Sequence, residues 1–288
     1  MGSACYRIPY QTLWSHLFDQ CSSCGVDVIF DIHVEKIVIP QVESQRPKVL
    51  SNTGNQFYGD LVFAADGHNS ATRELVIVND DGSDDDSIRE SEIFPKLDHW
   101  NSCRMTISIA NMRLDPNLKL LAEGNWWTVW MCNGCFFTGG KEGEDQYGLN
   151  VYFSNPQVKI HNMEWPTEVC DSAKLKKAYQ GEYEPNLQKL IEIAQSFHSS
   201  TQKPDVLSTF TNENYQVILI GDAAHAAMIN GSHNAALAVE DAFVLGYLFS
   251  RLASKEQISV FLNGYNQIRS KRTKMIRESD FALLHTLS

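Results

Sequence analysis

Two short apolar segments, one in each half of the chain, place the strongest constraint on its fold. Residues 61–65 (Leu-Val-Phe-Ala-Ala) and 217–220 (Val-Ile-Leu-Ile) lack the alternation of polar and apolar side chains that marks a half-exposed strand. Such segments are typical of strands buried on both faces, as in a parallel sheet. Each is followed at once by a turn that joins an acid to a glycine: Asp66-Gly67 and Gly221-Asp222. The sequence therefore predicts a mixed α/β (α+β) fold in which buried strands end in acidic turns.

The remaining periodicity divides the chain into three parts. Apolar residues at helical spacing predict a helix that opens at Pro9 and is capped by Gly25, and alternation predicts extended chain over 26–39. The pattern then predicts a hairpin over 49–58, aromatic-rich strands between 100 and 155, helices over 172–179 and 185–197, and two long helices over 235–253 and 257–284. This order predicts a middle domain inserted into a discontinuous first one.

The composition excludes several classes of protein. The 288 residues carry 24 Lys and Arg against 35 Asp and Glu, a formal net charge of -11, whereas nucleic acids and anionic membranes bind clustered positive charge. No apolar run approaches the roughly 18 residues of a membrane span, and the N-terminus lacks the pattern of a signal peptide. Seven cysteines, an odd number, argue against a disulfide framework. We therefore expect a cytoplasmic protein that binds neither nucleic acid nor a membrane.

Two other features raise the question of a metal site. The acidic stretch 79–87 has its glycine in the wrong place for an EF-hand calcium loop, so a solvated loop is favoured. The pairs Cys21/Cys24 and Cys132/Cys135 lie too far apart for a zinc ribbon, and neither follows the strand-to-helix turn of a thioredoxin-like site. Buried or incidental thiols are the favoured interpretation, and no metal site is predicted.

The two acidic turns, in this order, resemble motifs of the single-component flavin-dependent aromatic hydroxylases, the salicylate and para-hydroxybenzoate hydroxylase family. Asp66-Gly67 matches the family's Asp-Gly motif, and Gly221-Asp222 matches its Gly-Asp motif. Two further segments look like the family's arginine-plus-helix segment and its C-terminal Tyr/Arg helix: Tyr6-Arg7-Ile8-Pro9, and Tyr265 with Arg269 and Arg272. The resemblance covers nearly the whole chain.

The resemblance implies a domain arrangement and two cofactors. Residues 1–78 and 216–288 would be the remnant of a discontinuous FAD-binding domain, and residues 79–215 would be an inserted, β-rich substrate domain. The cofactors would be FAD and NAD(P)H.

The resemblance also implies roles for individual residues. Asp222 would accept hydrogen bonds from the ribityl chain of FAD, Arg7 would lie near the flavin, and Asp66 would help to hold FAD and NAD(P)H. The remaining cofactor-binding residues would be Gly67 and Gly221. The substrate pocket would be lined by Trp126, Trp127, Trp130 and Phe137, although the residues alone favour simple core packing of the three tryptophans about equally. His225, inside the Gly-Asp motif, is more readily a structural cap of the turn than a catalytic group.

The sequence also departs from the family's pattern. Family members begin with a strand, a Gly-x-Gly-x-x-Gly turn and a helix that hold the FAD pyrophosphate, and no two of the 17 glycines here are separated by a single residue. The implied fold is therefore a truncated one that lacks this N-terminal module. In the flavin loop, His233 and Asn234 stand where glycines would let the ring approach the backbone. Both departures predict that this chain alone binds FAD weakly or not at all.

Two functions of different classes stay open at this point. The first is that of a flavoprotein monooxygenase, which hydroxylates or epoxidises an aromatic or polyene small molecule, with the FAD module supplied from outside this chain. The second is that of an FAD-free isomerase, cyclase or epoxide-opening enzyme, which uses His233, Asp222 and Asp66 as acids and bases in the vacated pocket. The substrate, the choice between NADH and NADPH, and the oligomeric state do not follow from the sequence.

Overall fold

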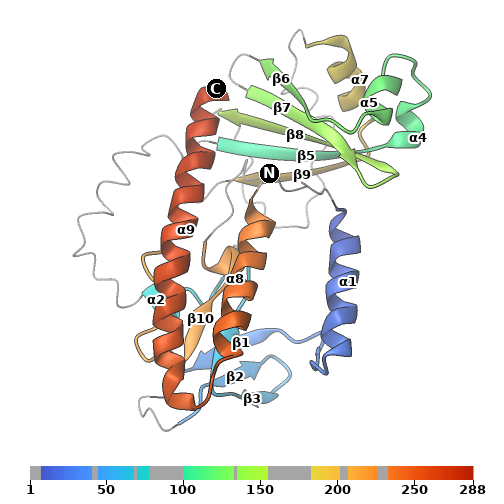
Figure 1. Ribbon diagram of the computed structural model, residues 1–288. Coiled ribbons are helices and arrows are strands. Elements are labelled where there is room, and N and C mark those ends of the chain that lie inside the picture. The colour runs from blue at the N-terminus through green and yellow to red at the C-terminus, as the bar shows by residue number, and fades with distance from the viewer. Residues whose placement is uncertain are drawn as a thin grey trace. The chain divides into compact units, whose positions relative to one another are not determined.

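A computed structural model describes most of the chain, and its contacts form two compact units (Figure 1). The described residues are 8–40, 45–67, 70–77, 100–132, 135–154, 183–201, 207–225 and 233–287. One unit comprises Met1–Phe30, His99–Thr201 and Thr286–Ser288, and the other comprises Asp31–Asp98 and Gln202–His285. Arg7, the acidic stretch 79–87 and the helix predicted over 172–179 lie outside the described residues. The predicted assignment of FAD and substrate domains concerns function and stays a prediction.

The first unit is built on a five-stranded antiparallel sheet in the order β6-β7-β8-β5-β9. Its strands are β5 (Trp100–Ser108), β6 (Thr128–Cys132), β7 (Cys135–Glu142), β8 (Gln146–Ser154) and β9 (Ser196–Thr201). Its helices are α1 (Tyr10–Ser23), α4 (Ile109–Met112), α5 (Lys119–Glu123) and α7 (Pro185–Ile193). One face of the sheet, with the apolar side of α7, forms a continuous hydrophobic core. The predicted aromatic-rich strands are thus confirmed.

Two predictions in this unit meet different outcomes. The helix predicted from Pro9 is confirmed as α1, and Gly25 follows it with φ +74°, a conformation that glycine adopts without strain. The helix predicted over 185–197 is too long. It ends at Ile193, because the backbone becomes extended at Ala194 and Gln195 donates its amide to the carbonyl of Thr106 at 2.9 Å. The chain then continues as β9, paired with β5.

The second unit contains two small sheets and the two long helices. Strands β1 (Val34–Val38), β2 (Lys48–Ser51) and β3 (Gln56–Tyr58) form an antiparallel sheet, and β4 (Val62–Ala64) pairs in parallel with β10 (Val217–Leu219). The helical elements are α2 (Glu74–Ile77), the 3₁₀ turn η2 (Gly221–Ala223), α8 (Asn234–Phe249), η3 (Lys255–Gln257) and α9 (Ile258–Leu287). The predicted hairpin and both long helices are confirmed. Of the extended chain predicted over 26–39, only β1 is a strand.

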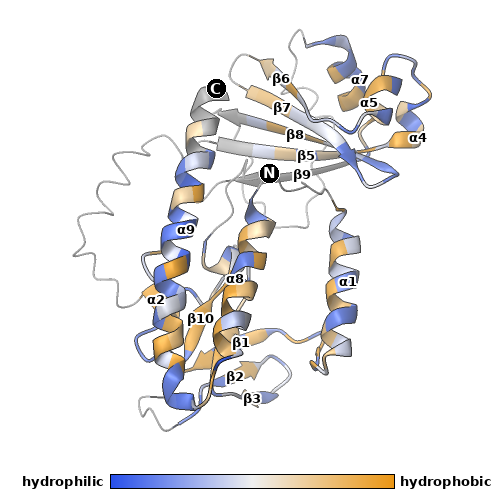
Figure 2. Ribbon diagram, viewed as in Figure 1, coloured by the Kyte–Doolittle hydropathy of each residue, from blue (hydrophilic) through white to orange (hydrophobic). Residues whose placement is uncertain are grey.

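The parallel pairing of the two apolar segments confirms the prediction that most constrained the fold. All three residues of β10 are fully buried, and Ile218 and Leu219 belong to a core that includes Leu262 and Tyr265 from α9. Figure 2 shows the apolar character of β10 and of α8. β4 is less enclosed than predicted, since Phe63 is 46% exposed in the structure. Burial on both faces therefore holds for β10 but not for β4. In the part of the chain that the structure describes, no helix combines the length and apolar character needed to cross a bilayer.

Candidate functional site

The parallel pair β4–β10 brings the two predicted motifs to the same sheet edge. Val62 lies opposite Val217 and Ala64 opposite Leu219, and the amide of Ile220 donates to the carbonyl of Ala64 at 3.0 Å. The turns that follow the two strands therefore start side by side. Both turns contain a glycine with positive φ, +78° at Gly67 and +58° at Gly221. Ligands of open α/β sheets bind outside such carboxyl ends of strands, so this edge is the candidate site.

Asp222 is the acid of this edge that is open to a ligand. It lies in η2, directly after β10, and is half-buried. Among the described residues its carboxylate has no hydrogen-bond or ion-pair partner. A half-buried carboxylate in this position can accept hydrogen bonds from the hydroxyl groups of a ligand.

Asp66, by contrast, is used within the fold. Its Oδ2 atom accepts hydrogen bonds from the amide of Thr72 at 3.2 Å and from the hydroxyl of Thr72 at 2.9 Å. The next residue, the buried Arg73, donates from Nε to the carbonyl of Ala223 at 2.7 Å. The Asp-Gly segment is thus tied to the Gly-Asp segment, and Asp66 shapes that connection. Its role as an acid or base stays a prediction.

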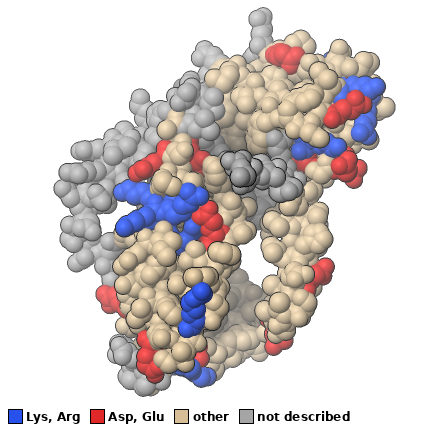
Figure 3. All heavy atoms as spheres, viewed as in Figure 1, with Lys and Arg blue, Asp and Glu red and all other residues tan. Residues whose placement is uncertain are grey.

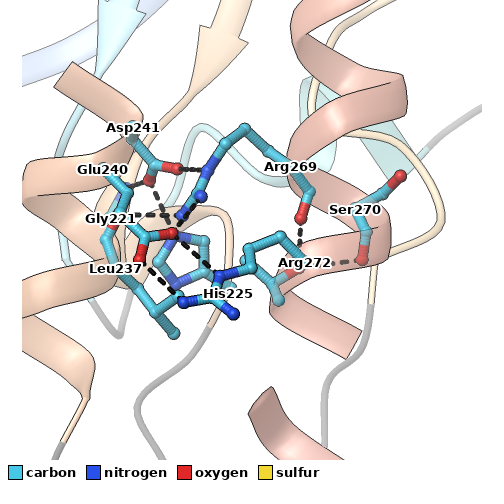
Figure 4. A network of polar contacts seen from close by, with 9 residues as sticks. Gly221, His225, Leu237, Glu240, Asp241, Arg269, Ser270 and Arg272 are labelled. Carbon is cyan, nitrogen blue, oxygen red and sulfur yellow. Dashed lines mark hydrogen bonds and ion pairs between the residues drawn. The ribbon is translucent and has the colours of Figure 1, made fainter. Parts of the chain in front are cut away.

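Behind the edge, the buried carboxylate of Asp241 on α8 connects three segments (Figure 4). Its Oδ2 atom accepts a hydrogen bond from the amide of Gly221 at 2.8 Å and lies 2.7 Å from Nε2 of His225. Its Oδ1 atom accepts a hydrogen bond from Nε of Arg269 at 2.6 Å. Burial alone would raise the pKa of Asp241, but these partners outweigh it and hold the pKa below its ordinary value. Asp241 is therefore ionised at neutral pH and fixes the turn that carries Asp222.

Arg269 extends this network to the surface. The side chain of Arg269 is 2% exposed, and it also donates to Oε2 of Glu240 at 2.5 Å and to the carbonyl of Leu237 at 3.0 Å. Arg272 donates to the same Glu240 carboxylate and, as the largest cause, lowers its pKa. Figure 3 shows basic and acidic side chains side by side over α8 and α9. The fully buried Tyr265 lies beside Asp241, and its pKa is raised by burial and by that negative charge.

His233 acquires a partner that the sequence did not indicate. It occupies the N-cap position of α8, and its Nδ1 atom lies 3.2 Å from Oδ1 of Asp280 on α9. The His233 side chain is 47% exposed, whereas Asp280 is buried. Burial raises the pKa of Asp280, and His233 only partly opposes that effect. A histidine held by a buried carboxylate is an arrangement that can orient an imidazole for proton transfer.

The four aromatic residues predicted to line a substrate pocket have different surroundings. Trp126 and Trp127 are about half exposed, whereas Phe137 is fully buried in the core of the first unit. Trp130 lies opposite Phe137 across β6 and β7 and donates from Nε1 to Oε2 of Glu184 at 3.2 Å. The pocket-lining role of these residues stays a prediction, and Phe137 also has a structural role.

Three residues of the site were not selected from the sequence: Asp241, Arg73 and Asp280. A signal existed for Asp241, because an acid on a strongly apolar helix must find a partner when it is buried. Nothing in the sequence selects the carbonyl of Ala223 as the partner of Arg73. Among the described residues, no group of three or more His, Cys, Asp or Glu could hold a metal ion.

Comparison with known proteins supplies relatives for this arrangement, although no family model matches the chain. The FAD-dependent monooxygenase atnJ of Arthrinium sp is 24% identical over 247 residues, which cover 84% of this chain and 54% of that protein. The FAD-dependent monooxygenase nodY1 of Hypoxylon pulicicidum is 24% identical over 283 residues, which cover 92% and 59%. The chain thus spans a little over half of the length of these curated relatives.

Solved structures share the fold. FqzB superposes with a TM-score of 0.74 at 20% identity, covering 96% of this chain and 60% of that one. CtdE in complex with FAD and a substrate superposes with a TM-score of 0.75 at 17% identity, covering 95% of this chain and 64% of that one. Klebsiella pneumoniae HpxO complexed with FAD and uric acid gives 0.70 at 20% identity (93% and 61%). The chain is thus similar in sequence to FAD-dependent monooxygenases and in fold to the solved structures above. These similarities confirm the resemblance inferred from the two acidic turns.

The Asp241–Arg269 pair predicts a large stability effect. Asp241→Asn keeps the size of the side chain but leaves the buried Arg269 without its fully buried counter-charge, so we expect a loss of about 3–5 kcal/mol of unfolding free energy at neutral pH. The matched control, Glu240→Gln, removes a neighbouring and partly exposed partner of Arg269 and is expected to cost less than about 1 kcal/mol. Urea unfolding measures both, and equal effects of the two substitutions would contradict the central role of Asp241.

The raised pKa of Asp280 predicts that the stability contribution of this residue decreases as the pH rises. Its pKa in the folded state lies above the ordinary value of 3.8, so its contribution to stability is complete below that value and is lost as the pH rises through the folded-state pKa. Asp280→Asn should therefore gain stability relative to the unmodified protein as the pH rises above about 3.9, the ordinary pKa of an aspartate, toward neutral pH. Urea unfolding across this range is the measurement, with Glu278→Gln, an exposed acid on the same helix, as the control. Parallel stability curves for the unmodified protein and Asp280→Asn would refute this.

Proposed function

We propose that this chain is part of an FAD-dependent monooxygenase that hydroxylates or epoxidises an aromatic or polyene small molecule. One observation carries the proposal: the carboxylate of Asp222, without a partner among the described residues, stands at the carboxyl end of β10 beside the turn that follows β4. Relatives with FAD in their names and structures with bound FAD support it. The open edge of a parallel sheet is where such a ligand binds.

The residues present fit one end of FAD. Asp222 would hold the ribityl hydroxyls, and Gly221, fixed by Asp241, would keep that carboxylate in place. The pyrophosphate end is different, because the sequence contains no Gly-x-Gly-x-x-Gly turn to hold it. When bound and reduced by NAD(P)H, FAD supplies the activation of oxygen. The chain's own residues would bind the ribityl chain and place the substrate. Arg7 stays a predicted neighbour of the flavin.

The substrate class is proposed from the aromatic residues of the first unit. Trp126 and Trp127 present about half of their surface, and Trp130 is held by Glu184. Flat indole rings are well suited to contact aromatic or polyene molecules by stacking. The proposed substrate is therefore a planar, mostly apolar small molecule.

A second candidate rests on the pair His233–Asp280. In an FAD-free enzyme, Asp280 would orient the imidazole, and His233 would transfer protons in an isomerisation, cyclisation or epoxide opening, with Asp222 as a second group. The visible absorption spectrum separates the candidates. A flavin band with oxygen uptake dependent on NAD(P)H supports the monooxygenase, whereas a colourless protein that converts a substrate supports the acid–base enzyme.

The lack of a Gly-x-Gly-x-x-Gly turn in this sequence predicts that the chain binds FAD weakly. Without a pyrophosphate cradle, contacts to the ribityl chain and ring should give only millimolar affinity, about 4 kcal/mol. We expect a colourless preparation and no heat of FAD binding by calorimetry at micromolar protein. A yellow preparation with stoichiometric FAD would show that pyrophosphate binding does not need that turn.

The role proposed for Asp222 can be tested with two flavins. Riboflavin carries the ribityl chain and lumiflavin does not, so saturation-transfer NMR, which detects weak binding, should show tighter binding of riboflavin. Asp222→Ala should weaken riboflavin binding by about 10- to 100-fold, the value of a hydrogen bond to a charged group, and leave lumiflavin unchanged. It should also abolish monooxygenase activity in the FAD-loaded enzyme.

The control for this experiment is the stability of the Asp222→Ala variant. Asp222 is a partly exposed turn residue, so urea unfolding of Asp222→Ala should change by no more than about 0.5 kcal/mol. If Asp222→Ala weakened the binding of riboflavin and lumiflavin equally, or unfolded the protein, Asp222 would be identified as a structural residue of the turn.

A further inference from the structure

Two thiols lie opposite each other where β6 ends and β7 begins, at the connected end of the β6–β7 hairpin, in the first unit and outside the candidate site. Cys132 is the last residue of β6, Cys135 is the first residue of β7, and the two are directly paired in the antiparallel register. Both are free cysteines. The sequence alone placed them at a short spacing, but it did not show that they face each other across two strands.

The backbone at this position matches the geometry of a disulfide. Directly opposite residues of an antiparallel pair have Cα atoms about 4.5–5.5 Å apart and side chains on the same face. Disulfides span Cα separations of about 4.4–6.8 Å, so the bond would form without separation of the strands. The third thiol of this sheet, Cys103, does not compete. It lies opposite Val151 of β8, which in turn lies opposite Phe137, so two strand spacings separate Cys103 from β7.

We propose that Cys132 and Cys135 are an oxidation site at which hydrogen peroxide, or a peroxide of similar size, forms a disulfide that cross-links β6 and β7 at the connected end of their hairpin. The sulfur of Cys132 attacks one peroxide oxygen, an S–O bond forms, the O–O bond breaks, and hydroxide leaves. The sulfur of Cys135 then attacks that of Cys132, the S–S bond forms, the S–O bond breaks, and water leaves. The two thiols lose two electrons and two protons, and hydrogen peroxide becomes two molecules of water.

The burial of the two thiols decides which reacts first and how fast. Cys132 is half-buried and Cys135 is buried, so the peroxide reaches Cys132 first. Burial raises the pKa of both thiols, that of Cys135 to about 12, and the neighbouring Tyr183 has its own pKa raised to about 12. The thiolate fraction at neutral pH is therefore small, and oxidation is slow. Because the reduced pair gains little from thiolate formation, the disulfide, once formed, resists reduction.

The two cysteines share one face of the sheet with a cluster of aromatic residues. On the same face, the next cross-strand pair is Trp130 with Phe137, and Tyr183 packs edge-on against Phe137 with ring centroids 5.6 Å apart. A bond between the two cysteines would hold β6 and β7 together next to the Trp130–Phe137 pair. The inference concerns this hairpin alone and does not depend on the proposed monooxygenase function.

The experiment uses the whole chain and hydrogen peroxide as the probe. The reduced protein is treated with peroxide, free thiols are alkylated, and peptides are identified by mass spectrometry. We expect Cys132 and Cys135 to become protected together, in a peptide lighter by two hydrogen atoms, while Cys103 stays reduced. Since both pKa values lie above the tested range, the rate should rise by about tenfold per pH unit from pH 6 to pH 8.

Matched variants separate the pair from other thiols. Cys21→Ser/Cys24→Ser removes a pair with the same sequence spacing at the end of α1 and should leave the reaction unchanged. Cys132→Ser should abolish protection of Cys135. The inference is overturned if Cys132 and Cys135 are alkylated independently in the unmodified protein, if Cys132 accumulates only as sulfinic acid, or if the product is an intermolecular disulfide. These three outcomes are read on the unmodified chain, so they do not depend on whether a variant folds.

Discussion

The second unit depends on one buried charge. A carboxylate taken out of water loses several kcal/mol of hydration, and only close donors can restore that loss. Asp241 finds three, the amide of Gly221, the ring of His225 and the guanidinium of Arg269. These donors come from the strand end, from the turn after it and from the last helix. Satisfying a single carboxylate therefore fixes the positions of β10, α8 and α9 together.

Three acids of this unit have different surroundings, although a sequence pattern cannot distinguish them. Asp241 is buried, ionised and fully used by the fold, Asp66 is used to shape the turn after β4, and Asp222 has no partner among the described residues. Because the amide of Gly221 is already bound to Asp241, the backbone at this turn needs nothing from Asp222. A carboxylate without such a partner, on a turn held by other residues, is what the ligand-binding role proposed for Asp222 requires.

The sequence predicted those parts of the fold that follow from local pattern. Continuous apolar segments identified β4 and β10, and helical spacing identified α1, α8 and α9, because burial on a regular element leaves a regular signal. Boundaries that depend on a distant partner were wrong. α7 ends early because the next residues pair with β5, and β4 keeps one exposed face. The partners of the site residues, Ala223 for Arg73 and Asp280 for His233, are contacts between distant segments and have no local signal.

Helices α8 and α9 are held together at two points whose acids differ in pKa. Near the strand end, Asp241 with Arg269 stays ionised because its partners lower the pKa, whereas near the start of α8, Asp280 has a pKa raised by burial. On acidification, Asp280 is protonated first, and its ionic attraction to His233 is lost while Asp241 still holds Gly221. The start of α8 is therefore sensitive to pH over a range in which the turn that carries Asp222 is not. Any chemistry at His233, whether proton transfer or accommodation of a flavin ring, would depend on pH separately from ligand binding at Asp222.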